Sequence, residues 1–155
     1  MPVDTPSAAL AITNLLATYA ECIDTGDLDR CARLFDHAQI KVGDGPAGAT
    51  LIDSDALLKL WRDNVILHAD GTPRTKHVIT NANIDVDEAG GVATCYSYYT
   101  VFQQLEGFPL QPIIAGRYHD TFERVADSWR WSYRDYTLID LVGDLSRHLR
   151  MEVPR

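Results

Sequence analysis

The sequence predicts an α+β fold in which helices come first and a long antiparallel sheet follows. Apolar residues recur at three- and four-residue steps as far as residue 68, and from residue 75 the apolar period changes to two. Short turn-forming sequences join the segments of period two, as in β-hairpins. A sheet of this length must bend, usually at β-bulges. We therefore expect a cone-shaped α+β barrel, in which a strongly curved antiparallel sheet wraps around the N-terminal helices.

Three helices are expected. The first spans Ser7 to Asp24, with Ser7 as its N-cap and Gly26 as the residue that stops it. The second is short and has Asp27 as its N-cap. The third runs from residue 53 or 54 to His68.

Five strands are expected. The first is brief, over residues 37–43, and a loop follows it over residues 44–50. The four long strands cover residues 75–86, 92–104, 111–125 and 129–141. The chain has 155 residues, of which 46% are hydrophobic, as is typical of one globular domain. We expect a single domain over residues 1–155, with the helices at about 7–68 and the antiparallel meander at about 75–141.

Charge and cysteine usage exclude several classes of protein. The net charge is −8 and no basic run is present, which argues against nucleic acid or an anionic membrane as a partner. The three cysteines are odd in number and form no CxxC pair, so a disulfide framework is not expected. No signal peptide or transmembrane stretch is evident. The expected location is the cytoplasm.

Common cofactor and metal motifs are missing. The sequence has no GxGxxG, GxxxxGK[ST] or GxSxG motif. The stretch DTGDLDRCARLF resembles a calcium loop only superficially, because glycine stands at its third position and Asp29 at its sixth. His68 and His77 have no partner at metal-site spacing, and His119 and Asp120 point to opposite faces of a strand. We expect neither a metal nor a cofactor.

One histidine interrupts a strand-like stretch, TPRTKHVITNANID, over residues 72–85. Strict alternation places one polar-rich set of residues on one face of this strand: His77, Ile79, Asn81 and Asn83. Val78, Thr80, Ala82 and Ile84 lie on the other. A face of mixed polarity suits a ligand cavity, but a solvent-facing surface has the same composition. His77 is therefore either an ordinary strand histidine or the base of an active site.

Asp24 is the acidic candidate. It ends the first helix beside the apolar stripe, and a carboxylate at a helix C-terminus opposes the helix dipole at a local cost of about 0.3–1 kcal/mol. Such a breach of a local rule sometimes marks a functional site. A solvated aspartate near a helix end is the other interpretation.

The order of three segments resembles a known family. These are YAECIDTGDLDRCARLF, then TKHVITNANIDVDEAGGVATCYSYYTV, then AGRYHDTFERVADSWRWSYRDY. From about Ala8 to Asp140 the chain is similar to the SnoaL-like branch of the nuclear-transport-factor-two superfamily. That superfamily contains scytalone dehydratase, bile-acid dehydratases and hexachlorocyclohexane dehydrochlorinase, and more loosely ketosteroid isomerase and limonene epoxide hydrolase. It also contains transport adaptors and the structural β subunits of ring-hydroxylating dioxygenases.

The resemblance implies a catalytic Asp–His dyad, whose two motif positions are Asp24 and His77 here. An arginine of the last strand in the dehydrochlorinase falls on Arg134. Two positions depart from the family pattern: Tyr19 replaces a lysine of the first helix, and a second histidine of scytalone dehydratase falls near Ser97. The implied activity is a β-elimination, as in a dehydratase or dehydrohalogenase, or an isomerisation.

The chemistry of such a pair is general acid–base catalysis. A neutral imidazole accepts a proton near pH 7, and a carboxylate on its other nitrogen fixes the tautomer and stabilises the imidazolium. Departure of hydroxide needs an acid, for which Tyr19, Tyr98 and His119 are available. Asn81, on the face of His77, is a candidate for binding a substrate carbonyl or hydroxyl.

The sequence does not show which face of the later strands turns toward the pocket. Alternation puts Tyr96, Tyr98 and Phe102 on one face of their strand and Tyr99 on the other, and it puts Trp129, Trp131 and Tyr133 on one face of theirs. Arg134 either binds an anionic group of the substrate or pairs with a carboxylate at the surface.

Three functions remain as alternatives. The first is a cofactor-independent lyase or isomerase acting on a small hydrophobic cyclic compound, with His77 as the base. The second is a non-catalytic subunit similar to the dioxygenase β subunits, and the third is a small-molecule binding module. A homo-oligomer, a dimer or trimer formed through the sheet face, is compatible with each.

Overall fold

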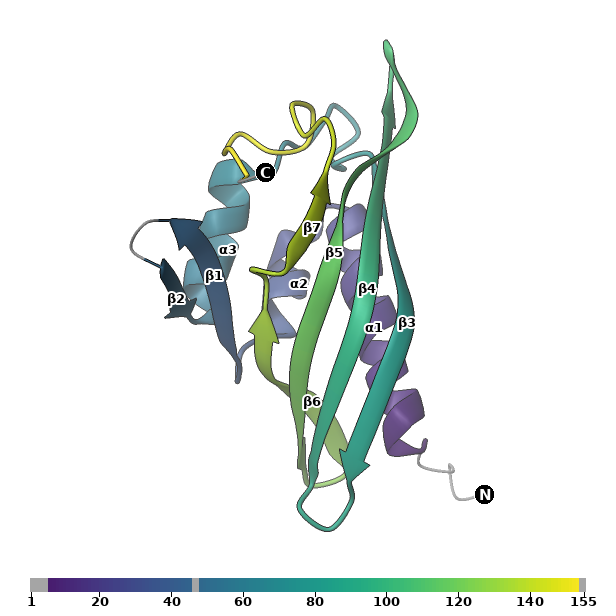
Figure 1. Ribbon diagram of the computed structural model, residues 1–155, viewed down its shortest axis with the longest axis vertical. Helices are drawn as coiled ribbons and strands as arrows, with labels where there is room; N and C mark the ends of the chain where they lie inside the picture. The colour runs from purple at the N-terminus through teal and green to yellow at the C-terminus, as the bar shows by residue number, and fades with distance from the viewer. Residues whose placement is uncertain (1–5, 46–47, 154–155) are drawn as a thin grey trace.

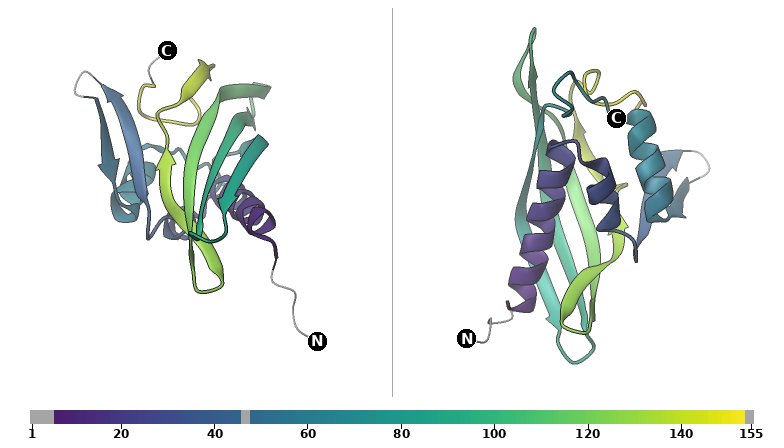
Figure 2. Two further views of the ribbon diagram at one scale, coloured as in Figure 1. Left: turned by 60° about the horizontal axis from the view of Figure 1, so that its bottom comes forward. Right: turned by 180° about the vertical axis from the view of Figure 1, so that it is seen from behind.

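The computed structural model describes residues 6–45 and 48–153, and it has the expected α+β architecture. Three helices lie on one side of a seven-stranded sheet, whose strand order is β2-β1-β6-β5-β4-β3, with β7 paired to β5. The sheet curves around the helices without closing into a complete barrel (Figure 1). Seen from behind, the helices cover the inner face of the sheet (Figure 2). No helix among these residues is long and apolar enough to cross a membrane.

The helix starts follow from their capping residues. In α1 (Ala8–Asp24) the Ser7 side chain accepts from the Leu10 amide, and in α2 (Leu28–Arg33) Asp27 accepts from the Arg30 amide. The expected caps of these two helices are therefore confirmed. Gly26 has φ +78°, and a Cβ there would overlap the carbonyl oxygen of Gly71. This close approach ties the end of α1 to the loop that precedes the central strands.

The third helix is shorter than expected. α3 (Ser54–Asn64) is capped by Asp53 and ends four residues before His68. Val65 is extended instead, and it forms an isolated β-bridge with Leu149 of the C-terminal segment. The helix therefore ends where the chain pairs with a distant segment, and the local sequence carries no stop signal at this position.

The strands depart from a simple meander at both ends of the sheet. The region expected to be a loop contributes to a hairpin of β1 (Gln39–Gly45) and β2 (Gly48–Ile52), although residues 46 and 47 lie outside the described part. β1 also pairs with β6 in parallel, so the sheet is not wholly antiparallel. The expected last strand is two strands, β6 (Ser128–Asp135) and β7 (Ile139–Val142).

The long central strands are β3 (Thr75–Asp87), β4 (Val92–Leu105) and β5 (Phe108–Val125). A bulge in β3 breaks its alternation, because the register with β4 shifts between Thr80 and Asn83, where Asn81 is left-handed (φ 54°). Beyond the bulge the inner side of β3 carries Ile84 and Val86, which pack against the core, while Asn81 is exposed. The prediction that Asn81 shares a face with His77 in the pocket was wrong.

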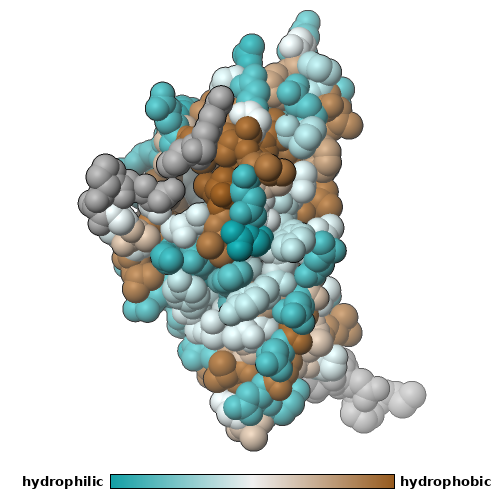
Figure 3. Space-filling model, in the orientation of Figure 1, coloured by the Kyte–Doolittle hydropathy of each residue, from teal (hydrophilic) through white to brown (hydrophobic). Residues whose placement is uncertain are grey.

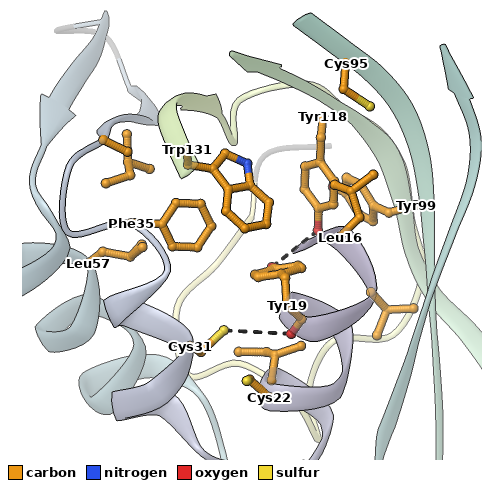
Figure 4. Packing of buried hydrophobic residues seen from close by; sticks show 14 of the residues in the cluster. Leu16, Tyr19, Cys22, Cys31, Phe35, Leu57, Cys95, Tyr99, Tyr118 and Trp131 are labelled. Carbon is orange, nitrogen blue, oxygen red and sulfur yellow. Dashed lines mark hydrogen bonds between the residues drawn. The ribbon is translucent and has the colours of Figure 1, made fainter. Parts of the chain in front are cut away.

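A second bulge changes β6 in the same way. Phe122 pairs with Trp131 but Thr121 pairs with Tyr133, so β6 has one extra residue at Ser132. Trp131 and Arg134 are therefore both fully buried, and the expected shared face of Trp131 and Tyr133 is absent. Figure 4 shows Trp131 packed beside Phe35, with Tyr19 of α1 directed toward Tyr118 of β5.

Candidate active site

The end of α1 meets the start of β3 through Asp24 and His77. Nδ1 of His77 lies 2.6 Å from a carboxylate oxygen of Asp24, which is within hydrogen-bond distance. The two side chains are only 7% and 9% exposed. A carboxylate only accepts hydrogen bonds, so Nδ1 carries the proton of this bond and Nε2 is left for other partners.

Asp24 is held by three donors. Its carboxylate accepts from Thr75 Oγ1 at 2.8 Å and from the backbone N–H of His77 at 2.8 Å, in addition to the imidazole. Burial alone would raise the pKa of Asp24, but the hydrogen bonds and charge of His77 and the bond from Thr75 outweigh burial and lower this pKa. The carboxylate therefore stays ionised and its orientation is fixed.

A cavity of about 460 Å³ opens in front of His77. Its volume lies in the range of small-molecule sites in proteins, and its wall is mostly aliphatic and aromatic. Asp24 lies behind His77 and is not among the lining residues. None of the described lining residues is lysine or arginine. The polar residues on the wall are Tyr19, Asn64, His77, Tyr99, Tyr118, Tyr136, Thr137, His148 and Glu152.

Three tyrosine hydroxyls form a chain at one wall of the cavity. Tyr136 donates to Tyr19 at 3.1 Å, and the Tyr19 and Tyr118 hydroxyls lie 3.5 Å apart. Three hydroxyls carry three hydrogens, and two contacts use only two of them. One hydrogen is therefore not used by the two contacts. Burial raises the pKa of each phenol, for Tyr136 to about 12, so all three stay protonated at neutral pH.

Arg134 lies deeper than a cavity residue. Its guanidinium makes a bidentate pair with Asp120 at 2.7 and 2.8 Å, and both side chains are 0% exposed. The charge stacks on the rings of Tyr118 and Tyr19, at 4.0 and 4.4 Å from their centroids. With no surface on the cavity, Arg134 cannot contact an anionic substrate group without rearrangement. The predicted surface pairing was also wrong, because its carboxylate partner is buried.

Two other expected site residues lie on the opposite side of the sheet. The inner face of β4 carries Ser97, Tyr99 and Val101, so Tyr98 points outward and is 53% exposed. His119 stacks on Tyr96 of the same outer face, with ring centroids 3.9 Å apart. Neither Tyr98 nor His119 lines the cavity. Their assignment to the site was wrong, because alternation alone does not say which face of a strand turns inward. Tyr19 does line the cavity.

Several polar residues of the cavity wall were not identified from the sequence, and three of them contact Tyr19 or His77. Tyr118 and Tyr136 are two of them. The periodicity of the first helix placed Tyr19 on its apolar side, but for the strand tyrosines the sequence did not show which face turns toward the cavity. The third is His148, which lies beyond the last expected strand in a segment without any periodicity. Among the described residues, no group of three or more histidines, cysteines, aspartates or glutamates is arranged to hold a metal ion.

Comparison with known proteins identifies the family. The model of the SnoaL-like domain matches residues 5–135, so the chain belongs to this family. A search of curated protein sequences gives no significant match.

Solved structures share the fold at low sequence identity. One is a protein from Novosphingobium aromaticivorans described as the β subunit of an aromatic-ring-hydroxylating dioxygenase, at 24% identity and TM-score 0.66, covering 87% of this chain and 90% of that one. Another from the same organism, described as a scytalone dehydratase, has 19% identity and TM-score 0.59, with 82% and 80% covered. A variant of Rv3472 from Mycobacterium tuberculosis, of unknown function, has 24% identity and TM-score 0.64, with 86% and 72% covered. These similarities establish the fold and leave the reaction to the site itself.

Proposed function

We propose that the protein is a cofactor-independent lyase or isomerase that removes a proton from a carbon atom next to a carbonyl group in a small, hydrophobic, cyclic substrate. His77 is the base and Asp24 orients it. The observation that carries the proposal is the bond from His77 Nδ1 to the buried Asp24, which leaves Nε2 for a mostly apolar cavity. Positioned base catalysis of this kind accelerates a reaction by about 10²–10⁴.

The elimination follows from the groups on the wall. Nε2 of His77 takes the proton, the electrons of the C–H bond form a carbon–carbon double bond, and the bond to the leaving group on the next carbon breaks. A departing hydroxide takes the spare hydrogen of the tyrosine chain and leaves as water. The proton on His77 then returns to the phenolate, which restores both groups. A departing halide needs no acid, and an isomerase returns the proton to another carbon.

The wall also favours an uncharged substrate. Among the described residues Glu152 is its one carboxylate, and no lysine or arginine there would neutralise an anion. Aromatic and aliphatic side chains supply most of the remaining surface, which suits a ring compound with one or two oxygen atoms.

Proton abstraction is testable without knowing the natural substrate. Cyclic ketones, including 1-tetralone, 3-hydroxy-1-tetralone and a halogenated cyclohexanone, would be incubated in D₂O and followed by NMR for deuterium at the α-carbon and for elimination products. We expect exchange or elimination on at least one ketone, reduced about 10²–10⁴-fold in His77→Gln. The melting temperature of the variant should stay close to that of the wild type, because Asp24 keeps its bonds to Thr75 and to the backbone.

A matched control is His37→Gln, which changes an exposed histidine that does not line the cavity. It should exchange at the wild-type rate. Equal rates in the wild type and His77→Gln across all the ketones would contradict the proposal, and the binding-module and subunit alternatives would then be preferred.

We further propose that the protein works in the cytoplasm as a homo-oligomer. Its three cysteines are all unpaired and buried, as suits a reducing compartment. The outer face of β3 and β4 exposes Val78, Tyr96 and Tyr98, each by 41% or more, which is a surface suited to a second copy of the chain. Light scattering on the purified protein measures the oligomeric state directly.

A further inference from the structure

A second imidazole reaches the cavity from the C-terminal segment. His148 lines the same wall as His77, and the centroids of the two rings are 6.3 Å apart. It is only 6% exposed, yet its Nδ1 has no hydrogen-bond partner among the described residues. Because Nδ1 is shielded from the cavity, Nε2 is the nitrogen of His148 that is left for a ligand.

The backbone around His148 is anchored on both sides. The Ile66 amide donates to the His148 carbonyl at 2.9 Å, and Gln103 Nε2 donates to the Arg147 carbonyl at 3.0 Å. The next residue, Leu149, forms the bridge to Val65. The imidazole is therefore held at the wall by fixed backbone on either side. Viewed from outside, hydrophobic residues gather in the upper part of the molecule over β7, close to where this segment leaves the sheet (Figure 3).

The surroundings of His148 keep it uncharged. Burial, followed by the neighbouring His77 and His68, lowers its pKa to about 4, although Asp24 acts in the opposite direction. A neutral imidazole has one N–H donor and one acceptor nitrogen. At neutral pH it is therefore a hydrogen-bonding group for an uncharged polar atom and not a counter-ion for an acid.

We propose that His148 is a substrate-binding residue that donates a hydrogen bond to the carbonyl oxygen of the substrate while His77 faces the hydrogen on the adjacent carbon. This inference rests on the proposed function and specifies the substrate as a ketone or similar carbonyl compound. The two rings are neighbours on the wall, so a ligand lying in front of both places its carbonyl oxygen at one ring and the hydrogen of the adjacent carbon at the other. As the proton leaves, negative charge develops on the carbonyl oxygen, and the bond from His148 strengthens.

The division of roles between the polar groups follows from their positions. His148 and His77 lie side by side on the wall, and the tyrosine chain approaches from α1, β5 and the segment after β6. The carbonyl oxygen then lies at His148 and the acidic hydrogen at His77. The leaving group lies at the tyrosine hydroxyl hydrogen that is not used within the chain of hydroxyls. No two of these tasks fall on one side chain.

A pair of ligands that differ by one oxygen tests the hydrogen bond. 1-Tetralone has a carbonyl oxygen, and tetralin has the same ring skeleton without it. Their affinities would be measured by fluorescence of Trp61, which lines the cavity, for the wild type, His148→Phe and His148→Gln. We expect His148→Phe to weaken 1-tetralone about tenfold and tetralin less than twofold, whereas His148→Gln, which keeps an N–H donor, retains most of the 1-tetralone affinity.

Two results would overturn this role of His148. One is an equal change for both ligands in His148→Phe, and the other is a wild-type protein that binds 1-tetralone no more tightly than tetralin. ¹⁵N NMR of the imidazoles gives a reading without any substitution, because 1-tetralone should shift the His148 N–H signal and tetralin should leave it in place. Binding requires no turnover, so failure here is distinguishable from failure of the exchange assay on His77.

Discussion

Two buried aspartates of this protein are paired with basic side chains, and the two pairs differ in what surrounds them. Asp120 and Arg134 are 0% exposed, and aromatic rings enclose the guanidinium. Asp24 and His77 are nearly as buried, at 9% and 7%, but the imidazole lies on the wall of a cavity. Arginine does not lose its proton in proteins, whereas histidine exchanges one near neutral pH. The first pair can therefore only support the fold, and the second can also carry out chemistry.

The difference between the pairs also appears in their other contacts. Three donors hold the Asp24 carboxylate, so loss of the imidazole leaves two. The Asp120 carboxylate accepts two hydrogen bonds from Arg134, and one nitrogen of that guanidinium, Nη1, meets no hydrogen-bond partner within the described chain. Removal of one partner should consequently be far more costly at Asp120 than at Asp24.

The largest expected effect is on stability at the enclosed pair. Arg134→Met keeps much of the side-chain volume and leaves the Asp120 carboxylate buried without its partner, so we expect a loss of about 3–5 kcal/mol in the free energy of unfolding. The matched change at the other pair, His77→Gln, should cost about 1 kcal/mol. Urea unfolding of both variants measures the two losses.

The double variant Arg134→Met with Asp120→Leu removes both charges and should recover much of the stability lost in Arg134→Met alone. Similar losses for Arg134→Met and His77→Gln would contradict the distinction between a supporting pair and a functional one.

A smaller effect is expected in the pH dependence of stability, and it concerns His148, the imidazole beside His77. The pKa of His148 falls from 6.5 to about 4 on folding. Between these values the unfolded chain binds a proton at His148 that the folded chain does not, so stability falls as the pH is lowered from 6.5 toward 4. The contribution lost over that window is at most about 3 kcal/mol.

Melting temperatures at pH 7 and pH 4.5 measure this effect. We expect His148→Phe to lose less stability than the wild type over the interval, because phenylalanine takes up no proton. The lowered pKa of Asp24 acts at lower pH, since its stabilisation is lost as the pH falls below about 4. Identical slopes for the wild type and His148→Phe between pH 7 and pH 4.5 would show that His148 is not buried in its neutral form.

The sequence predicted one half of the site better than the other. Asp24 and His77 were recognisable because a helix end and a strand position coincided with a family pattern, and their bond lies where two regular elements meet. Asn81 was misplaced because the bulge beside it reverses the strand faces, and a bulge has no period of its own. No sequence pattern identified His148, because only long-range contacts to Ile66 and Gln103 fix the position of its segment.

The fold itself was predictable to the level of layers. Helical and strand periods and the capping residues were sufficient for α1, α2 and the three central strands. The end of α3 and the parallel pairing of β1 with β6 depend on partners far away in the chain, which local patterns do not encode. The same limit left the faces of Tyr98 and His119 undecided, since burial is a property of the whole sheet.

The most direct test of the central claim is the protonation of the His77 ring, measured by ¹⁵N NMR of the imidazoles at pH 8. The Asp24–His77 geometry predicts a proton on Nδ1, bonded to the carboxylate, and an unprotonated Nε2 on the cavity side. Asp24→Asn should remove the preference for this tautomer, and Asp29→Asn, a change at an exposed aspartate, should not. A wild-type His77 with its proton on Nε2 would contradict the account, because no base would then face the cavity.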